Sequence, residues 1–430
     1  MRFKPMLEKA ANQIAAPLSA SSKRSAVRAG AAVALAGIVT ACQPVTLGGP
    51  GYSTRPTPGV NPPVIAQPTG EVLGSGSVRV ALLTPSSAPG QFGKAGQSIR
   101  NAAAMALQDY SSADLQVIVK DVGQDQAALQ ASKALAEGAQ LVIGPMRSAQ
   151  VKTAGTVLKP AGVPMLAFTT DTGVAARGVY LINFTPENDV DRMISYAASK
   201  GKRSIAAMLP ATPYGSVVEA SLRQTAARNG VRILAIEKYK SGGKADPFSL
   251  QTAAEKLGEI KNQIDAMYIP EGVAAVPATQ LLAGQGIRAN KIQFLGSGQW
   301  DNASVSREPM LRGAWYPAPP ASLRNLDGRT IGFDVFANRY TQQYGERPPR
   351  VAALAYDAVI LSAALVAQAG ERRFAHETLT DPQGFIGFGD GFFRFRPDGT
   401  SQRSLGIKEI TTSGAKLIEN APMSAAGLPN

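Results

Sequence analysis

The chain has 430 residues, of which 44% are apolar and 17% carry a charge, so it can bury a large core and its composition excludes an intrinsically disordered protein. Its formal net charge is +13, but the basic residues form no block and no stripe with interleaved aromatic residues. These features exclude a nucleic-acid partner and describe a solvated, mildly cationic surface.

The N-terminus has the pattern of an export signal. A basic segment up to Arg28 precedes an uncharged apolar run, residues 29–41, which is too short to span a bilayer but has the length of a signal-peptide core. Cys42 follows directly and is the only cysteine, so it cannot form a disulfide within the chain. The alternatives at this point are a lipid attachment site and a plain cleavage site with an incidental cysteine.

The tetrapeptide Val39-Thr40-Ala41-Cys42 resembles a bacterial lipobox. The resemblance implies that residues 1–41 are a lipoprotein signal peptide and that Cys42 is acylated, which anchors the chain to a membrane at the periplasmic face of the cell envelope. Gln43, in place of an Asp, implies outer-membrane localisation. More than one acyl chain is needed for firm anchoring, as such a modification would provide.

Residues 42–77 are rich in Pro and Gly and show no apolar period, which predicts a semi-extended tether. After it, strand and helix patterns alternate. The predicted strands of the first half are 78–83, 115–119, 141–143 and 163–168, and the predicted helices are 94–110, 125–137 and 148–159. This alternation predicts βαβ units and a parallel sheet covered by helices on both faces.

The same rhythm starts again downstream. Strands are predicted at 204–209, 232–238, 266–269 and 293–295, helices at 215–229, 249–262, 274–285, 328–344 and 351–369, and final strands at 391–395 and 405–410. The fold class is therefore α/β, with two doubly wound, Rossmann-like lobes. Ligands of such sheets bind beyond the carboxyl ends of the strands, so a cleft between the lobes is the expected site.

The segment around residues 80–107, VALLTPSSAPGQFGKAGQSIRNAAAMAL, resembles the opening of the leucine/isoleucine/valine-binding family, the type I periplasmic binding proteins. Further matches are Val142-Ile143-Gly144-Pro145, Val163-Pro164-Met165-Leu166 and Pro213-Tyr214-Gly215. The likeness extends over residues 78–412. It implies a first lobe at 78–186, a second at 187–315, a return to the first lobe at 316–387, C-terminal strands of the second lobe at 388–412, and a flexible tail at 413–430.

Within this family, the stretch Gly296-Ser297-Gly298-Gln299-Trp300-Asp301 is similar to the branch of penicillin-binding protein activators, lipoproteins that stimulate peptidoglycan synthases. The enterobacterial activators carry an additional N-terminal helical-repeat domain that this chain lacks. Two functions follow as expectations: an activator whose partner is a penicillin-binding protein, placed slightly ahead, and a substrate-binding lipoprotein that delivers a small polar, amino-acid-like ligand to an ABC permease.

The resemblance also implies candidate ligand-binding residues in the first lobe. Ser148 matches the residue that holds a ligand carboxylate at the start of a helix, where free N–H groups favour an anion; the alternative is a plain N-cap. Thr169 and Asp171 match the next contacts. The Thr hydroxyl suits a carboxylate and the Asp suits an ammonium group, and the alternative for both is turn chemistry.

In the second lobe, Tyr214 is expected either to stack on a ligand or to cover the core edge. The acid that pairs with the ligand ammonium in the family falls at Gly298, so this chain lacks it, and Glu271 is the candidate substitute, with a solvated loop acid as the alternative. Trp300 is expected to line the cleft or to pack between the lobes.

An enzyme is not expected. The single histidine, His376, lies in a charged stretch that predicts a surface position, and no HExxH, Walker A or Gly-x-Ser-x-Gly motif occurs. The sequence therefore predicts no metal site and no cofactor.

Overall fold

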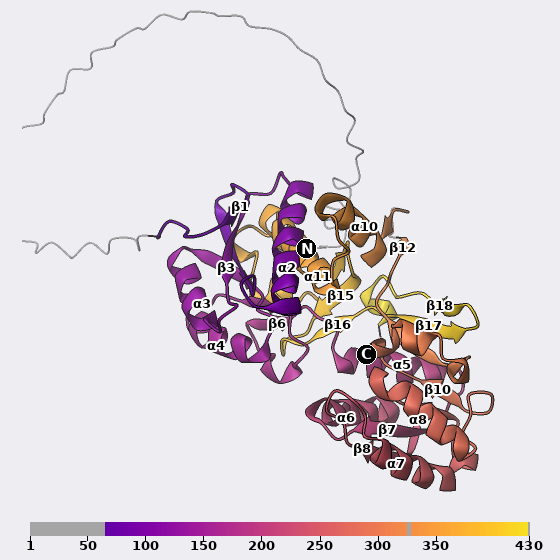
Figure 1. The fold of residues 1–430 in the computed structure, drawn as a ribbon. Coiled ribbons are helices and arrows are strands. Elements are labelled where there is room, and N and C mark those ends of the chain that lie inside the picture. The colour runs from indigo at the N-terminus through magenta and orange to yellow at the C-terminus, as the bar shows by residue number, and fades with distance from the viewer. Residues whose placement is uncertain (1–64, 325–327, 429–430) are drawn as a thin grey trace, which may run out of the picture.

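The computed structural model describes residues 65–324 and 328–428, and Figure 1 shows them as two lobes joined by a narrow waist. The predicted signal peptide, Cys42 and most of the predicted tether lie outside the described residues. The two-lobed α/β architecture agrees with the predicted fold class.

The first lobe contains a six-stranded sheet in the order β1-β3-β2-β4-β5-β6. Its strands are β1 (Val72–Leu73), β2 (Val78–Thr84), β3 (Leu115–Asp121), β4 (Ala139–Ile143), β5 (Met165–Ala167) and β6 (Val179–Leu181). All neighbours pair in parallel except β1, which is antiparallel to β3. The central strands are almost entirely buried, as expected for a parallel sheet that has helices on both faces.

Two layers of helices cover this sheet. The helices α2 (Gly90–Asp109), α10 (Phe333–Tyr344) and α11 (Arg350–Gln368) share one apolar core with one face, and α3 (Ala127–Ala136) and α4 (Ser148–Leu158) share another core with the opposite face. Helix α11 is long and apolar enough to cross a membrane, but most of it is buried inside the lobe, so it is a core helix.

The second lobe contains a seven-stranded sheet in the order β18-β17-β11-β10-β9-β7-β8. Its strands are β7 (Ser204–Pro210), β8 (Arg232–Tyr239), β9 (Ala266–Tyr268), β10 (Gln293–Leu295), β11 (Trp315–Ala318), β17 (Gly406–Thr411) and β18 (Gly414–Glu419). The helices α5 (Pro186–Ser199) and α6 (Pro213–Arg228) cover one face, and α7 (Pro247–Glu259) and α8 (Gly272–Gly284) cover the other. The short helix α9 (Ala303–Ser306) lies beside α8 and β18.

The chain crosses between the lobes three times, from β6 to α5, from β11 onward, and from β16 to β17. The remaining small elements are the hairpin β12 (Leu323–Arg324) and β13 (Thr330–Ile331), the short helix α12 (His376–Leu379), and the sheet of β14 (Phe385–Gly387), β15 (Gly391–Phe395) and β16 (Ser401–Arg403). Phe385, Phe393 and Phe395 of this sheet belong to the core of the first lobe.

The structure differs from the expected boundaries at three places. Strand β11 still belongs to the second lobe, although the return to the first lobe was expected at 316. The segment 388–412 is divided, because the phenylalanines of β15 pack into the first lobe and only β17 joins the second sheet. The expected tail contains β18, which pairs with β17 and so completes the sheet edge.

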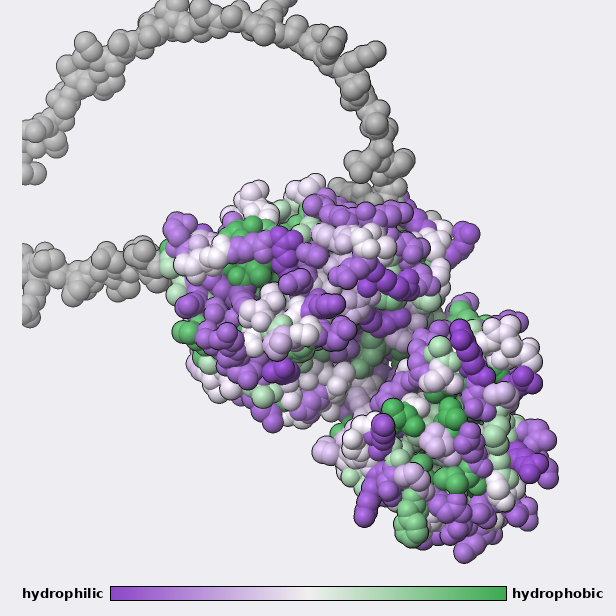
Figure 2. Space-filling view, viewed as in Figure 1, coloured by the Kyte–Doolittle hydropathy of each residue, from purple (hydrophilic) through white to green (hydrophobic). Residues whose placement is uncertain are grey.

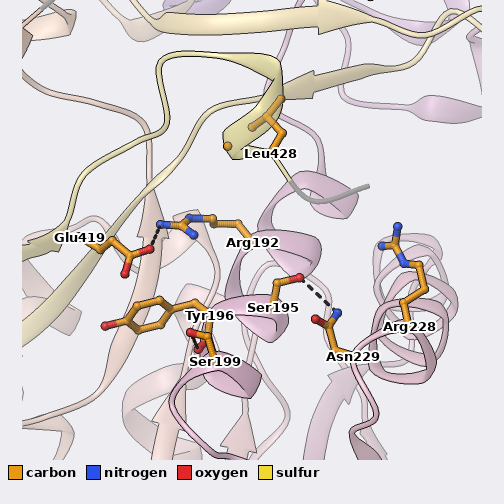
Figure 3. A pocket seen from close by; sticks show the side chains of 9 residues that line it. Arg192, Ser195, Tyr196, Ser199, Arg228, Asn229, Glu419 and Leu428 are labelled. Carbon is orange, nitrogen blue, oxygen red and sulfur yellow. Dashed lines mark hydrogen bonds and ion pairs between the residues drawn. The ribbon is translucent and has the colours of Figure 1, made fainter.

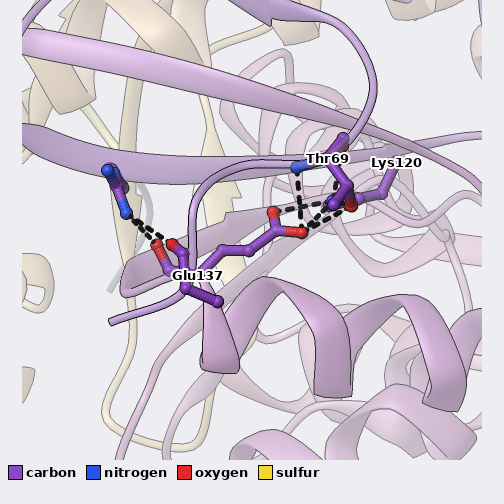
Figure 4. Close-up of polar contacts among 5 residues, drawn as sticks. Thr69, Lys120 and Glu137 are labelled. Atoms are coloured by element: carbon purple, nitrogen blue, oxygen red, sulfur yellow. Dashed lines mark hydrogen bonds and ion pairs between the residues drawn. The ribbon is translucent and has the colours of Figure 1, made fainter. Parts of the chain in front are cut away.

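The predicted tether also ends earlier than residue 77, because residues 66–73 are bound to the first lobe. The Thr69 amide and hydroxyl donate to a Glu137 carboxylate oxygen at 3.1 and 2.6 Å, and the buried Lys120 ammonium lies 2.7 Å from the other oxygen. Figure 4 shows these contacts around the Glu137 side chain. A buried ammonium needs hydrogen-bond acceptors on several sides, and the arriving segment supplies the Thr69 carbonyl at 2.8 Å.

Candidate functional site

The carboxyl ends of the parallel strands in both lobes carry the loops that hold most of the candidate residues. In the first lobe these loops follow β4 and β5, and in the second lobe they follow β7, β9 and β10. Figure 2 shows a hollow between the two lobes. One contact joins the two sides directly: the Thr172 hydroxyl, just after β5, donates to the Glu187 carboxylate at the start of α5 at 2.6 Å.

Ser148 is the first residue inside α4, and Arg147 takes the N-cap position without a side-chain cap bond. Ser148 therefore lacks the N-cap geometry that was its alternative interpretation. The side chain is half-buried at the point where the first N–H groups of α4 lack intrahelical partners. This end of α4 offers a hydroxyl and backbone donors to an anion.

Thr169 and Asp171 form the turn that was their alternative interpretation. The Asp171 amide donates to the Thr169 hydroxyl at 3.1 Å, and the Asp171 carboxylate accepts from the Gly173 amide at 3.0 Å, at the start of η1 (Thr172–Val174). Thr169 is only 6% exposed, whereas Asp171 is exposed. A hydroxyl that accepts one bond still has its own proton to donate, so the turn holds the Thr169 side chain without using up its donor.

Tyr214 lies in the first turn of α6, half-buried at the edge of the second core. Burial raises the pKa of its phenol far above the ordinary value, and the negative charge of Asp189 acts in the same direction; the side chains of Ser297 and Gln299 lie beside the hydroxyl and oppose the shift. The phenol is therefore neutral at physiological pH, and it can both donate and accept a hydrogen bond.

Glu271 follows β9 and precedes α8, and hydroxyl groups of its own lobe already bind it. The Tyr239 hydroxyl donates to one carboxylate oxygen at 2.9 Å, and the Ser241 hydroxyl lies 2.9 Å from both oxygens. Glu271 is half-buried rather than a fully solvated loop acid, and its carboxylate mainly connects the loop after β8 to the start of α8.

Trp300 neither lines the cleft nor packs between the lobes. It is 0% exposed and belongs to the core of the second lobe, 6.5 Å from the ring of Tyr316. The chain bends over the indole at Gly296, where a β-carbon would lie 2.1 Å from a ring atom. An indole with no accessible surface cannot touch a ligand, so Trp300 is a core residue.

The structure adds one residue that was not among the candidates. Asp189 lies in the first turn of α5, and its carboxylate accepts the Gly298 amide at 2.9 Å. Burial raises the pKa of Asp189 to about 7, the Gly298 hydrogen bond opposes this shift, and the nearby Glu187 adds to it. The sequence signals for α5 were present: Pro186 at its first position and acids in its first turn are typical of a helix start.

His376 is half-buried rather than on the surface, and its Nδ1 lies 2.8 Å from the Tyr180 hydroxyl. Both line a cavity of about 490 Å³ on the first lobe. Within the described part of the chain, no group of three or more His, Cys, Asp or Glu side chains is arranged to hold a metal ion.

Another cavity, of about 470 Å³, lies outside the strand-end loops, between α5 and the C-terminal segment (Figure 3). Its arginines are bound by the protein itself: Arg192 pairs with Glu419 at 2.7 Å, and Arg228 pairs with Asp191. This cavity is therefore lined by structural ion pairs.

Comparisons with known proteins agree with the two-lobed architecture. A family model described as "Periplasmic binding protein" matches residues 77–415. A search of curated proteins found no match.

Many solved structures share the fold. A putative branched-chain amino acid ABC transporter protein from Rhodospirillum rubrum superposes with a TM-score of 0.66 at 19% identity, over 79% of this chain and 99% of that one. A leucine-, isoleucine-, valine-, threonine- and alanine-binding protein from Brucella ovis, in a closed conformation, gives 0.62 at 13% identity, over 83% and 97%. A solute-binding protein from Rhodopseudomonas palustris BisB5, in complex with 3,4-dihydroxybenzoic acid, gives 0.54 at 17% identity, over 81% and 96%.

Proposed function

Because this chain belongs to the periplasmic binding protein family, we propose that it is the solute-binding component of an ABC importer and that it binds a small carboxylate ligand between its lobes. The observation that carries the proposal is the arrangement in the first lobe, where the open N-terminus of α4, Ser148 and the Thr169 hydroxyl lie at the carboxyl ends of adjacent strands, β4 and β5. The compared transport proteins favour this function over the activator role, which has no support among them.

The donors of the first lobe fit a carboxylate. The first backbone N–H groups of a helix point along its axis and have no intrahelical partners, and the helix dipole adds a partial positive charge. A Ser hydroxyl at the first position and a Thr hydroxyl on the next strand-end loop add donors from two directions. Hydrogen bonds to a charged group contribute about 1.5–3 kcal/mol each, which is enough to orient a ligand by its carboxylate.

Closure of the lobes would complete the site. The second lobe contributes the Tyr214 phenol, and Thr172 and Glu187 already connect the two sides. Hinge motion of two lobes around a ligand excludes water and strengthens each polar contact. We propose no catalytic step, and Trp300 and Glu271 have structural roles in this mechanism.

We also propose where the protein lies in the cell envelope. Family membership implies a periplasmic protein, and we propose that acylation of Cys42 anchors it there by a tether that ends near residue 65. An importer component works beside an inner-membrane permease, whereas Gln43 favours the outer membrane. These two observations point to different membranes. Separation of the inner and outer membranes, followed by detection of the protein in each, shows which membrane holds the anchor.

The test is a ligand panel on the detergent-solubilised lipoprotein. The twenty standard amino acids, benzoate and 3,4-dihydroxybenzoate are screened by thermal unfolding, and compounds that raise the melting temperature are followed by isothermal titration calorimetry. A ligand present at 100 times its Kd stabilises the folded state by about 2.7 kcal/mol, which shifts the melting temperature measurably. Failure of every compound in the panel to bind contradicts the proposed function.

A further inference from the structure

The cavity of about 490 Å³ on the first lobe lies at the amino ends of β5 and β6. Two of its lining residues show this position, because Pro164 comes directly before β5 and Gly178 directly before β6. The two strands are parallel, so their amino ends lie at the edge of the sheet opposite to Ser148 and Thr169. The cavity is therefore separate from the proposed ligand site between the lobes.

The floor of this cavity is apolar and belongs to the packed core. Phe374 and Tyr180 line it, are 7% and 1% exposed, and are members of the core of the first lobe. The half-buried Val163 and Pro164 add apolar surface beside them. Because core packing fixes these side chains, the cavity is preformed, and its size suits the apolar body of a small molecule.

Basic side chains from three segments line the same cavity. They are Lys159 at the end of α4, Arg177 before β6, and His376 at the start of α12. No acidic side chain of the described residues belongs to the lining. Lys159 has no ion pair in this part of the chain, and Arg177 has a loose one, 3.7 Å from Glu377, which lies outside the lining. The cavity therefore has positive charge that the protein compensates only weakly.

Other cavities in the described part of the chain differ in this respect. The cavity in Figure 3 is lined by Glu419, a second one by Asp191 and Asp398, and a third by Asp301. A carboxylate in the lining repels an anion at short range. The cavity beside His376 lacks that repulsion, so it is the better candidate for a site that takes an anion.

His376 is held in a way that provides a hydrogen-bond donor. Its Nδ1 lies 2.8 Å from the Tyr180 hydroxyl. Burial raises the pKa of Tyr180, so the phenol keeps its proton, and the Gly178 amide donates to its oxygen. The phenol proton is then directed to Nδ1, which leaves the ring hydrogen on Nε2. Nε2 has no hydrogen-bond partner among residues 65–324 and 328–428, so it can donate to a bound anion.

We propose that this cavity is a second binding site, which takes a small organic carboxylate with its apolar body on the floor and its charged group at Arg177 and His376. The planar guanidinium of an arginine can bind both oxygens of a carboxylate side by side. Lys159 adds positive charge at the rim. A zwitterionic amino acid does not fit this site, because the lining offers no acid to its ammonium group.

The test uses two probes of the same shape, indole-3-acetate and indole-3-acetamide, of which only the first is charged. His376 is the only histidine of the chain, so its imidazole resonances in NMR spectra report this cavity alone. The chain from residue 42 onward is used with Cys42→Ser, so that no acyl group requires detergent. We expect indole-3-acetate to shift these resonances with a Kd of about 1 mM or below, and the amide to bind at least about tenfold more weakly.

Arg177→Gln and Arg372→Gln are a matched pair of variants. Both arginines pair with Glu377, at 3.7 and 3.4 Å, and their side chains are 71% and 73% exposed, but only Arg177 lines the cavity. Each substitution removes one positive charge beside the same glutamate. We expect Arg177→Gln to raise the Kd of indole-3-acetate at least about threefold, as for a solvent-exposed charged contact, and Arg372→Gln to leave it unchanged.

Three results overturn the inference. His376 resonances that do not move at about five times the expected Kd show that the cavity binds no carboxylate of this kind. Equal affinities for the acetate and the amide show that the cavity takes apolar bodies without selecting the charge. Equal losses in the two arginine variants show a general effect of surface charge in place of a direct contact. The proposed function stands in each case, because its ligand panel concerns the cleft between the lobes.

Discussion

Replacing Lys120 with Met should destabilise the first lobe strongly. Lys120 is 3% exposed, and its ammonium donates to one Glu137 oxygen at 2.8 Å and to the Thr69 carbonyl, and lies 2.7 Å from the other Glu137 oxygen. Met fills a similar volume but leaves the Glu137 charge buried with only the two Thr69 donors. Removing one partner of a buried ion pair typically costs about 3–5 kcal/mol, so we expect a loss of that size.

Urea unfolding followed by circular dichroism measures this loss, and Lys256→Met is the matched control. Lys256 also pairs with a glutamate, Glu237, at 3.0 Å, but it is 59% exposed, so its loss should cost about 0–1 kcal/mol. A double variant, Lys120→Met with Glu137→Leu, should recover most of the stability because it removes the uncompensated charge. A Lys120→Met variant within 1 kcal/mol of wild type would show that the pair contributes no stability and would refute this reasoning.

The same pair predicts a pH dependence. Burial alone raises the pKa of Glu137, but hydrogen bonds from Lys120 and Thr69 outweigh it and hold the pKa below the ordinary value. Since the folded pKa is depressed, the stabilisation is present above the ordinary glutamate pKa and is lost as the pH falls through the folded value. Lys120→Met should therefore lose less stability on acidification than wild type does, which the same urea titrations at pH 7 and pH 3 will measure.

Three further predictions concern the anchor, the first lobe and the second core. Cys42→Ser should move the protein from the membrane pellet to the soluble fraction after cell fractionation, and continued pelleting would contradict acylation at this position. Ser148→Ala should raise the Kd of a carboxylate ligand about tenfold in calorimetry, because it removes one charge-assisted hydrogen bond, and an unchanged Kd would remove Ser148 from the site. Trp300→Ala should lower the free energy of unfolding by about 3–5 kcal/mol through an unfilled core cavity, whereas unchanged stability would contradict its burial.

The alternating elements could be predicted from the sequence because the central strands are mostly apolar and several helices have an apolar stripe. The predicted strands at 293–295 and 391–395 coincide with β10 and β15. The edge strands were harder to predict from the sequence. Strand β18 is mostly exposed and carries Lys416 and Glu419, so it shows no apolar pattern and is specified only by its pairing with β17.

The sequence predicted the position of a candidate residue only where that residue directly follows a predicted strand. Ser148 and Thr169 follow strand ends, and the structure places them at that edge. The indole of Trp300 follows β10 in the same way, but the tight turn at Gly296 directs it into the core. Side-chain direction in a short loop depends on such local turns, which the spacing of apolar residues does not reveal.

Asp189 illustrates a different limit. The family resemblance implies that an acid is lost at Gly298, and it made Glu271, on the adjacent loop, the candidate substitute. The carboxylate that lies beside Gly298 comes instead from α5, 109 residues earlier in the chain. Only the packing of α5 against the end of β10 brings the two together, and no local pattern records that contact.

Hydrogen bonds between two of the crossings hold the start of α5 in place. The Asn188 side chain donates to the Ser401 carbonyl at 3.1 Å and accepts from the Arg403 amide at 3.0 Å, and the buried Arg403 guanidinium donates to the Ile182 carbonyl at 2.9 Å. These bonds join the crossing from β6 to α5 with the crossing from β16 to β17. Asp189 is the next residue after Asn188, so it sits at the pivot rather than at the rim.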